Sequence, residues 1–221
     1  MRLSQIFVSM SGEQNAFGIG YPSIFVRFYG CGRDCRGCDT QYAMRGEKYE
    51  EVTPETVFNR IKKLITQYGV GLITLTGGEP LEQDTDELLD LMNRLNSEEV
   101  FISIETNGYE NLDPFMDVPN MSFVVDWKLS SAKIKGESLI QEQVGYLGED
   151  DFVKFVVCDD VDMIEAVTAI KTIREFDCKI AIGLHSITSF TYRQLIESLA
   201  ESNVLGDVTI NFQAHKHLKL D

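Results

Sequence analysis

Three cysteines in one short segment carry the clearest chemical signal in this sequence. Cys31, Cys35 and Cys38 form a C-x-x-x-C-x-x-C pattern within a glycine-rich stretch. Thiolates spaced this closely can hold one metal centre. Zinc in a structural site usually takes four ligands, so zinc here would have to borrow Asp39 or a distant histidine. An iron–sulfur cube held by three thiolates leaves one iron open to an added ligand, and the pattern favours that chemistry.

The other two cysteines, Cys158 and Cys178, stand at predicted strand boundaries and are typical of small buried apolar groups. The total of five is odd, and no signal peptide is evident before the strand-like Ile6–Val8. These features favour metal or redox chemistry over disulfides and predict a cytoplasmic location in a reducing cytosol. One alternative remains for the cluster, namely three unrelated buried thiols.

The charge of the chain limits the partners that it can bind. Its 221 residues include 20 Lys and Arg against 35 Asp and Glu, which gives a net charge of −15. A surface this acidic repels phosphate groups, so we expect no nucleic acid and no anionic membrane as a partner. No apolar run is long enough to span a bilayer. A small cationic pocket for an anionic substrate remains compatible with this composition.

Apolar, β-branched runs alternate with helical periodicity along the chain. We expect strands at residues 23–28, 72–76, 100–104, 123–125, 152–157, 179–184 and 208–212, and helices at 53–68, 88–95, 161–176 and 191–202. Strands that are apolar on both faces are typical of a buried parallel sheet. The predicted fold class is therefore α/β, an open, partial TIM-like barrel of about six parallel strands. No linker divides the chain, and we predict one domain over residues 1–221.

Two of the predicted helices show apolar stripes at 3.6-residue spacing, which indicate the face buried against the sheet. The first helix should begin at Thr53 and Pro54, a side-chain cap followed by proline at the first helical position. The stripes comprise Val57, Ile61, Leu64, Ile65 and Tyr68 in the first helix and Ile164, Val167, Ile170 and Ile173 in the third.

Unusual polar segments follow the predicted strands. Because the carboxyl ends of parallel strands meet at one edge of a sheet, we expect these segments to converge on one active-site mouth. In chain order they are the cysteine segment, Gly77–Pro80, Glu105–Gly108, Asp126–Lys128 and Gln213–His215.

The cysteine segment and Gly77-Gly78-Glu79-Pro80, each after a strand, together resemble the radical S-adenosylmethionine (SAM) superfamily. In that superfamily the cysteines hold a [4Fe–4S] cluster and SAM binds its open iron. One electron then cleaves SAM to methionine and a 5′-deoxyadenosyl radical. The resemblance implies that Cys31, Cys35 and Cys38 hold such a cluster and that Gly77–Pro80 meets the SAM amino group. Glycine suits this role because it permits close backbone approach.

A finer resemblance covers nearly the whole chain and points to the 7-carboxy-7-deazaguanine synthase family. It rests on Phe7–Glu13, Phe25–Arg27, Cys38–Thr40, Thr76–Leu81, Glu105–Gly108, Asp126–Ser131 and Phe212–Lys216. It implies a lyase that contracts 6-carboxy-5,6,7,8-tetrahydropterin to 7-carboxy-7-deazaguanine and releases ammonia, in 7-deazapurine (queuosine) biosynthesis. It also implies Mg²⁺, a homodimer and an electron donor such as flavodoxin or ferredoxin.

The resemblance implies roles for individual residues. The substrate contacts that it implies are Met10, Ser11, Gly12, Arg27 and Thr76, and the implied Mg²⁺ ligand is Thr40. The implied SAM contacts are Gly37, Asp39, Gly78, Asp126, Trp127, Lys128, Gln213, Ala214 and His215. A planar guanidinium suits a substrate carboxylate, and a hydroxyl oxygen suits a hard cation.

Some residues depart from the family pattern or have a simpler interpretation. Gln14 stands where the family has a glycine, and Gly37 replaces an aromatic residue that would lie near the adenine. Arg27 could instead form an ordinary salt bridge, Thr40 could cap a turn, and His185 fits a structural role as well as a place in the site. The alternative functions are a glycyl-radical enzyme activase and a non-catalytic zinc-binding protein.

Overall fold

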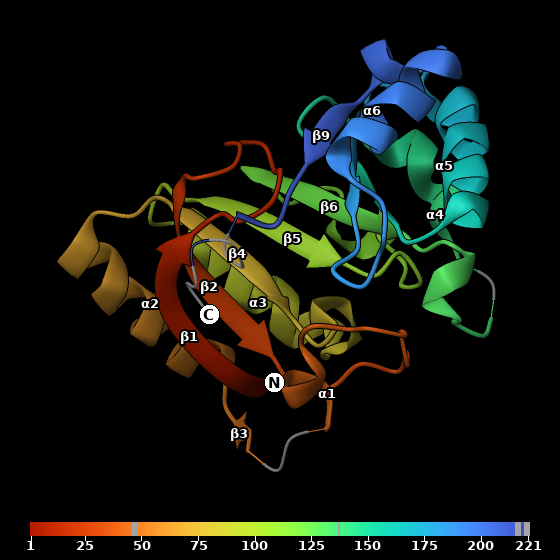
Figure 1. The fold of residues 1–221 in the computed structure, drawn as a ribbon. Coiled ribbons are helices and arrows are strands. Elements are labelled where there is room, and N and C mark those ends of the chain that lie inside the picture. Colours follow the sequence, from red (N-terminus) through yellow and green to blue (C-terminus); the bar gives the residue numbers. More distant parts are fainter. Residues whose placement is uncertain (46–47, 137, 215–217, 219–221) are drawn as a thin grey trace.

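One twisted sheet organises the chain (Figure 1). The computed structural model describes residues 1–45, 48–136, 138–214 and 218. Within these ranges nine strands follow the order β3-β1-β2-β4-β5-β6-β7-β8-β9. They are β1 (Arg2–Met10), β2 (Pro22–Phe28), β3 (Glu50–Glu51), β4 (Leu72–Gly77), β5 (Phe101–Thr106), β6 (Met121–Trp127), β7 (Phe152–Val157), β8 (Lys179–Leu184) and β9 (Thr209–Asn211).

The sheet confirms the prediction of an open, partial β/α barrel. From β2 to β9 every neighbouring pair is parallel, so the parallel part of the described chain has seven strands where about six were expected. The strand β1 contains the strand-like Ile6–Val8 and runs antiparallel to both β2 and β3, a direction that the sequence pattern did not predict. Among the described residues, β3 and β9 end the strand order on opposite sides, so backbone pairing does not close the barrel. One domain over residues 1–221 stays a prediction.

The helices flank the sheet (Figure 1). They are α1 (Gln41–Arg45), α2 (Pro54–Tyr68), α3 (Thr85–Asn96), α4 (Ile140–Gln143), α5 (Asp160–Ile173) and α6 (Tyr192–Glu201). Short 3₁₀ turns are η1 (Pro80–Glu82), η2 (Asp113–Phe115), η3 (Ser130–Ala132), η4 (Val144–Tyr146) and η5 (Leu205–Asp207). Helix α2 contacts β1 and β2, α3 contacts β5, α5 contacts β7, and α6 contacts β8. The helices thus hold the strands whose ends form the predicted mouth.

Local capping explains where α2 begins and ends. The Thr53 hydroxyl accepts a hydrogen bond from the Thr56 amide at 3.3 Å, and Pro54 is the first helical residue. At the other end Gly69 adopts a left-handed conformation with φ of 65° and donates its amide to the Ile65 carbonyl. Only glycine takes this conformation without strain, which makes it a common helix terminator. Both predicted boundaries of this helix are confirmed.

The predicted buried faces are only partly confirmed. In α2, Val57 and Ile61 are fully buried, whereas Tyr68 at the last turn is 55% exposed, so the prediction for Tyr68 is wrong. In α5 the prediction for Ile164 is wrong, since that side chain is 69% exposed. The predictions for Ile170 and Ile173 are confirmed, and the other buried residues of α5 are Asp162, Met163, Ala166 and Ala169. The two alanines let this face lie close to the sheet, and alanine was not counted in the apolar stripe.

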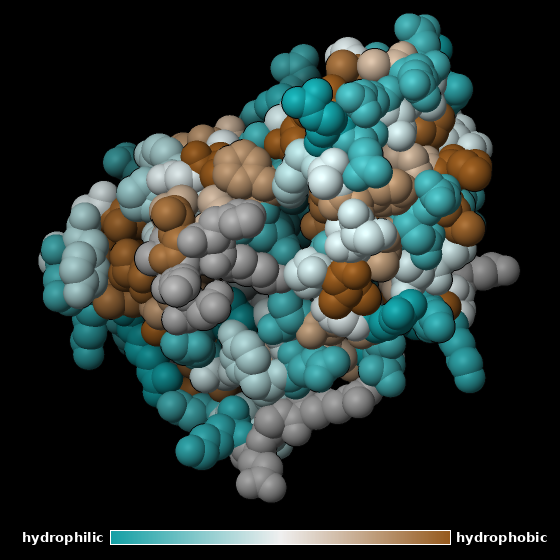
Figure 2. All heavy atoms as spheres, in the orientation of Figure 1, coloured by the Kyte–Doolittle hydropathy of each residue, from teal (hydrophilic) through white to brown (hydrophobic). Residues whose placement is uncertain are grey.

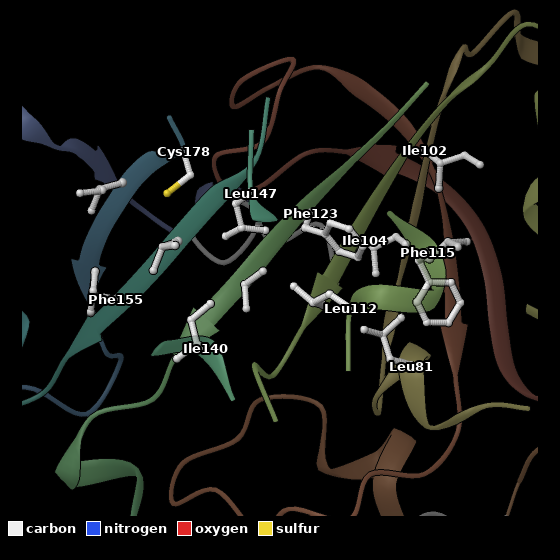
Figure 3. Packing of buried hydrophobic residues seen from close by; sticks show 14 of the residues in the cluster. Leu81, Ile102, Ile104, Leu112, Phe115, Phe123, Ile140, Leu147, Phe155 and Cys178 are labelled. Atoms are coloured by element: carbon white, nitrogen blue, oxygen red, sulfur yellow. The ribbon is translucent and has the colours of Figure 1, made fainter. Parts of the chain in front are cut away.

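Connections between strands contribute much of the core on the outer side of the sheet (Figure 3). Leu112 and Phe115, from the segment between β5 and β6, pack beside Ile104 and Phe123 of those strands. All four side chains are at most 2% exposed. Cys178 belongs to the same core, which confirms its prediction as a small apolar group, whereas Cys158 is only partly buried.

The surface is mostly hydrophilic in the view of Figure 2, with separate apolar groups, one of them over α5. That group coincides with the outward face of the helix, where Val161 and Ile164 are exposed. None of the described helices is both long enough and apolar enough to cross a bilayer.

The burial pattern of α5 gives a prediction with an internal control. Ile170→Ala should lower the free energy of unfolding by about 2–5 kcal/mol, because the side chain is fully buried and leaves a cavity. Ile164→Ala on the same helix should change it by less than about 0.5 kcal/mol. Urea denaturation followed by circular dichroism measures both, and equal losses would contradict the assigned buried face.

Candidate functional site

A cavity of about 860 Å³ opens at the carboxyl ends of the parallel strands. Each polar segment singled out in the sequence contributes to its lining. The lining residues from these segments include Cys31, Cys35, Cys38, Gly77, Gly78, Glu79, Glu105, Asn107, Asp126, Trp127, Lys128 and Gln213. The predicted convergence on one mouth is therefore confirmed. Its volume is of the size that holds a cofactor with a small substrate.

Backbone hydrogen bonds fix the cysteine segment at one wall of this cavity. The Gly30 amide donates to the Ala43 carbonyl at 2.9 Å, and the Arg36 amide donates to Ala132 at 2.9 Å. Glu82 accepts from the Gly32 amide at 2.7 Å. The segment is thus tied to α1, to η3 and to the turn after β4, so its thiols have defined positions before any metal binds.

Two glycines allow the turn after β4 to lie against the cysteine segment. The Gly78 amide donates to the Phe28 carbonyl at 2.9 Å, and the Glu79 amide donates to Gly30 at 2.7 Å. A Cβ atom on Gly78 would lie 2.0 Å from the Gly30 carbonyl oxygen. Gly77 has a φ of 116°, a conformation that other residues rarely adopt. No other residue type fits this pair without moving the cysteine segment.

The Glu79 carboxylate is turned inward and anchors the next strand end. It accepts hydrogen bonds from the Asn107 amide at 2.7 Å and from the Thr106 hydroxyl at 2.8 Å. Burial raises the pKa of Glu79 to about 7 despite these donors. Asn107 in turn places its side-chain amide 3.8 Å from the Cys31 sulfur. Glu79 therefore joins the ends of β4 and β5 behind the cysteines.

The donor set of the cysteine segment fits the iron–sulfur cluster that the family resemblance implies. All three thiols line one cavity, and Gly37 and Gly78 leave backbone surface open beside them. In the described part of the chain, no three His, Cys, Asp or Glu side chains converge at the spacing of one metal ion. A multi-iron cluster takes each thiolate at a different iron. Burial raises the pKa of the Cys31 thiol to about 11, so metal binding must release its proton.

Polar residues from neighbouring parallel strands form the floor of the cavity. Arg27 of β2 is the cross-strand partner of Thr76 of β4, and Asp126 of β6 is the partner of Lys154 of β7. Between them the Thr76 hydroxyl donates to Glu105 of β5 at 2.7 Å. Burial raises the pKa of the Glu105 carboxyl. The sequence predicted only some of these floor residues, because it indicated neither Lys154 nor the position of Glu105 on the cavity floor.

The Arg27 side chain lies between two aromatic rings. Its guanidinium carbon is 5.5 Å from the centre of the Phe7 ring and 5.3 Å from that of Tyr42, and it donates a hydrogen bond to the Tyr42 hydroxyl. Its Nε atom is buried without a hydrogen-bond partner. None of the salt bridges found between described residues involves Arg27, and the ordinary salt-bridge interpretation stays open. Arg27 thus places a cation at the cavity wall, while its Nε–H group is enclosed by protein without a partner.

Lys154 connects the floor with the segment after β1. Its ammonium donates to Glu13 at 2.6 Å and lies 3.1 Å from a carboxylate oxygen of Asp126, which also pairs with Lys128. Burial disfavours the charged forms of both acids, but the lysines outweigh it and hold the pKa of Glu13 and of Asp126 below their usual values. Burial likewise opposes the charge of Lys154, yet Asp126, Glu13 and Glu105 raise its pKa well above the usual value.

The end of the described chain closes the open side of the barrel beside Glu13. The Ala214 amide donates to the Gly12 carbonyl at 2.8 Å, and Asn211 accepts from the Gln14 amide at 2.9 Å. Gln213 donates to Glu13 at 2.8 Å and to Asp39 of the cysteine segment at 3.3 Å. These hydrogen bonds connect the residues at and after the end of β9 with the segment after β1 and with the cysteine segment.

Most of the predicted site residues line the cavity. Those that do are Met10, Gly12, Arg27, Gly37, Asp39, Thr40, Thr76, Gly78, Asp126, Trp127, Lys128 and Gln213, with the three cysteines. Ser11 and Ala214 are buried behind the lining, and the Ser11 amide and carbonyl bond to Tyr21 and Gly20. His215 lies outside the described residues. The ligand of each residue stays a prediction.

His185 occupies the space beside Gly37. A Cβ atom on Gly37, whose φ is 75°, would lie 2.5 Å from the His185 ring. The ring lines the cavity and its Nδ1 accepts from the Ile187 amide at 3.2 Å. His185 therefore belongs to the site wall, which the sequence left undecided. Its position directly after β8 was the available signal.

The chain is similar in sequence to known proteins. The sequence pattern of the radical SAM superfamily matches residues 25–120. A 7-carboxy-7-deazaguanine synthase from Clostridium acetobutylicum is 34% identical over 95% of this chain and 92% of its own length. Another from Methanospirillum hungatei is 32% identical over 100% of this chain and 86% of its own.

Solved structures show the same fold. The crystal structure of QueE from Escherichia coli superposes with a TM-score of 0.74 at 24% identity, covering 97% of this chain and 94% of that one. Streptococcus suis SuiB, bound to its precursor peptide SuiA, gives a TM-score of 0.60 at 16% identity over 90% of this chain and 50% of that one.

The contact between Gly78 and Gly30 gives a second prediction. Gly78→Ala should displace the cysteine segment, because the added methyl group would overlap the Gly30 carbonyl. We expect most bound iron to be lost after anaerobic reconstitution. Gly71→Ala, where no atom lies within 4 Å of the new methyl group, is the control and should keep its iron. Normal iron content in Gly78→Ala would show that the close contact does not position the cysteines.

Proposed function

The chain belongs to the 7-carboxy-7-deazaguanine synthase family of radical SAM enzymes, and we propose that it converts 6-carboxy-5,6,7,8-tetrahydropterin to 7-carboxy-7-deazaguanine with release of ammonia. This carbon–nitrogen lyase reaction belongs to 7-deazapurine (queuosine) biosynthesis. One observation carries the proposal. A single cavity joins three thiols, a glycine turn and a polar floor that carries the Arg27 cation.

The cofactors assigned to the site are a [4Fe–4S] cluster and SAM. Cys31, Cys35 and Cys38 would hold the cluster, and the backbone at Gly37 and Gly78 would face SAM. When bound, this pair supplies a carbon radical that removes a hydrogen atom from the substrate and returns it. The protein's own contribution is placement and exclusion of water. The ties of the cysteine segment to Ala43 and Ala132 serve the first task.

The polar floor suits a carboxylated pterin. Arg27 would pair with the substrate carboxylate, because it lines the cavity and its guanidinium is held between two rings. Glu13 and Glu105 provide acceptors for the N–H groups of the pterin ring. Thr76, which donates to Glu105, would fix the orientation of that carboxylate.

The alternative functions are less well supported. A glycyl-radical enzyme activase acts on a protein backbone, whereas relatives that span the chain are 7-carboxy-7-deazaguanine synthases. A zinc-binding protein would need a fourth ligand beside the three cysteines. We further propose a homodimer, a separate protein that donates the electron, and a reducing cytosol in which the three thiols stay available.

An anaerobic product assay tests this function. Reconstituted protein is incubated with SAM, a reductant, Mg²⁺ and the carboxytetrahydropterin, and the products are separated by chromatography and identified by mass. We expect 7-carboxy-7-deazaguanine, with SAM regenerated rather than consumed. Absence of this product at every Mg²⁺ concentration, with SAM cleavage intact, would redirect the search to the activase. Zinc without iron or sulfide in anaerobically purified protein would support the zinc-binding alternative.

A third prediction concerns the thiols. Replacing any one of Cys31, Cys35 and Cys38 by alanine should abolish SAM cleavage, because two thiolates cannot hold the cube in a fixed position. Cys158→Ala and Cys178→Ala are the matched controls and should keep the visible absorption of the cluster. Iron content, absorption and methionine release measure these effects. SAM cleavage at the normal rate by Cys35→Ala would overturn the cluster assignment.

The role of Thr40 gives a fourth prediction. Its hydroxyl lines the cavity, donates to the Gly77 carbonyl at 3.1 Å and lies 3.5 Å from the Cys38 sulfur. We propose that this oxygen binds Mg²⁺ together with the substrate, since Mg²⁺ takes few protein ligands. Thr40→Ala should keep the cluster and SAM affinity but lose most Mg²⁺ stimulation of turnover, and Thr40→Ser should restore it. Unchanged Mg²⁺ dependence in Thr40→Ala would leave only the hydrogen bond to Gly77.

A further inference from the structure

Lys154 is a charged residue in a strand that is otherwise apolar. The strand β7 reads Phe-Val-Lys-Phe-Val-Val, and its lysine side chain is only 10% exposed. Burying an ammonium is costly unless anions compensate it. Two acids from separate parts of the chain do so here. Neither the cluster nor the predicted ligand contacts explain this lysine.

The ammonium joins the two sides of the cavity. Glu13 follows β1 and belongs to the segment proposed to receive the pterin, and its carboxylate is 2.6 Å from the lysine nitrogen. Asp126 is the second-to-last residue of β6 and belongs to the segment proposed to receive SAM, and its carboxylate is 3.1 Å away. Asp126 is also the cross-strand partner of Lys154, so the sheet register itself sets this contact.

The other charged groups around the lysine increase the repulsion that its ammonium must offset. Glu105 faces it from β5 and Lys128 lies beyond Asp126, so three carboxylates share two ammonium groups. Gln213 completes the surroundings with a hydrogen bond to Glu13. Without Lys154, the three acids would share only Lys128, and repulsion would move the Glu13 segment away from Asp126.

We propose that Lys154 is a positioning residue that holds Glu13 and Asp126 in register, so that the pterin and SAM are bound at a fixed separation. The pterin half of this inference rests on the proposed function. The SAM half does not, because Asp126 belongs to the segment proposed to receive SAM whatever the second substrate is. Lys154 itself touches neither ligand in this proposal and acts through the two carboxylates.

Kinetics of charge-removing and charge-keeping variants test the proposal. Lys154→Met replaces the ammonium with an unbranched apolar chain of similar length. It should keep its cluster, raise the KM for the pterin by about tenfold or more, and lower kcat by less than that. Lys154→Arg keeps the charge and should recover much of the lost affinity. Lys179→Met, near the start of the neighbouring strand β8 with a side chain 48% exposed, is the matched control and should behave as wild type.

Trp127 provides a second readout that needs no pterin. It is the single tryptophan of the chain, follows Asp126 directly and lines the cavity. SAM titrations of the reconstituted enzyme, followed by Trp127 fluorescence, should give weaker SAM binding in Lys154→Met and near-normal binding in Lys154→Arg and Lys179→Met. If the wild type makes no product from the pterin, the proposed function fails while this titration still tests Lys154.

Three outcomes would overturn the role of Lys154. The first is unchanged KM and SAM affinity in Lys154→Met. The second is equal loss in Lys154→Met and Lys154→Arg with clusters intact, since the charge would then be irrelevant. The third is complete loss of pterin and SAM binding in a folded Lys154→Arg, and it decides the matter if Lys154→Met does not fold. In that case, retained binding in Lys154→Arg would support the proposal.

Discussion

The contact between the backbones of Gly30 and Gly78 is the constraint on which the site depends. The carbonyl of one residue stands where the side chain of the other would be, and two hydrogen bonds hold the strand ends in that position. Cys31 follows Gly30 directly, so its distance from the turn after β4 is set mainly by the main chain. Side-chain packing could not give this precision, because side chains change rotamer while a backbone pair does not. The rest of the mouth is built outward from this contact, through Glu79 to the end of β5.

The site also depends on how the barrel is closed, because the barrel has too few strands to close by backbone pairing. In the described chain seven parallel strands leave a gap, and a gap admits water to a site that needs protection from it. The segment after β1 and the end of β9 fill this gap with the hydrogen bonds of Gly12 and Asn211. Gln213 donates hydrogen bonds to both Glu13 and Asp39, so the residues that close the barrel are also connected to the cysteine segment. The open side of the fold thus becomes the wall where both ligands are proposed to meet.

The fold and the location of the site could be predicted from sequence because both depend on periodicity and on strand ends. Parallel strands place their following segments at one edge, so the convergence needed no knowledge of side-chain geometry. The buried face of α5 was harder to predict, because Ala166 and Ala169 contribute to it and the predicted stripe counted only larger apolar side chains. The edge strand β3 has only two residues and leaves no periodic pattern. Lys154 was missed for another reason, because its partners Glu13 and Asp126 come from distant segments and only the sheet register reveals them.

That missed lysine also shows how the chain separates stability from chemistry. The outer side of the sheet is filled with aliphatic and aromatic groups, whose burial supplies most of the folding free energy. The inner side near the mouth holds buried charges, which contribute little net stability once desolvation is counted. A lysine among Phe and Val residues therefore adds little to the stability of the core. Replacing a buried ion pair with well-packed apolar side chains often stabilises a protein. Such an arrangement is retained where fixed charges are useful, and here they lie on the floor of the one cavity that also holds the three thiols. In an acidic chain, the buried ammonium of Lys154 offsets the repulsion between the carboxylates of Glu13 and Asp126 that lie beside it.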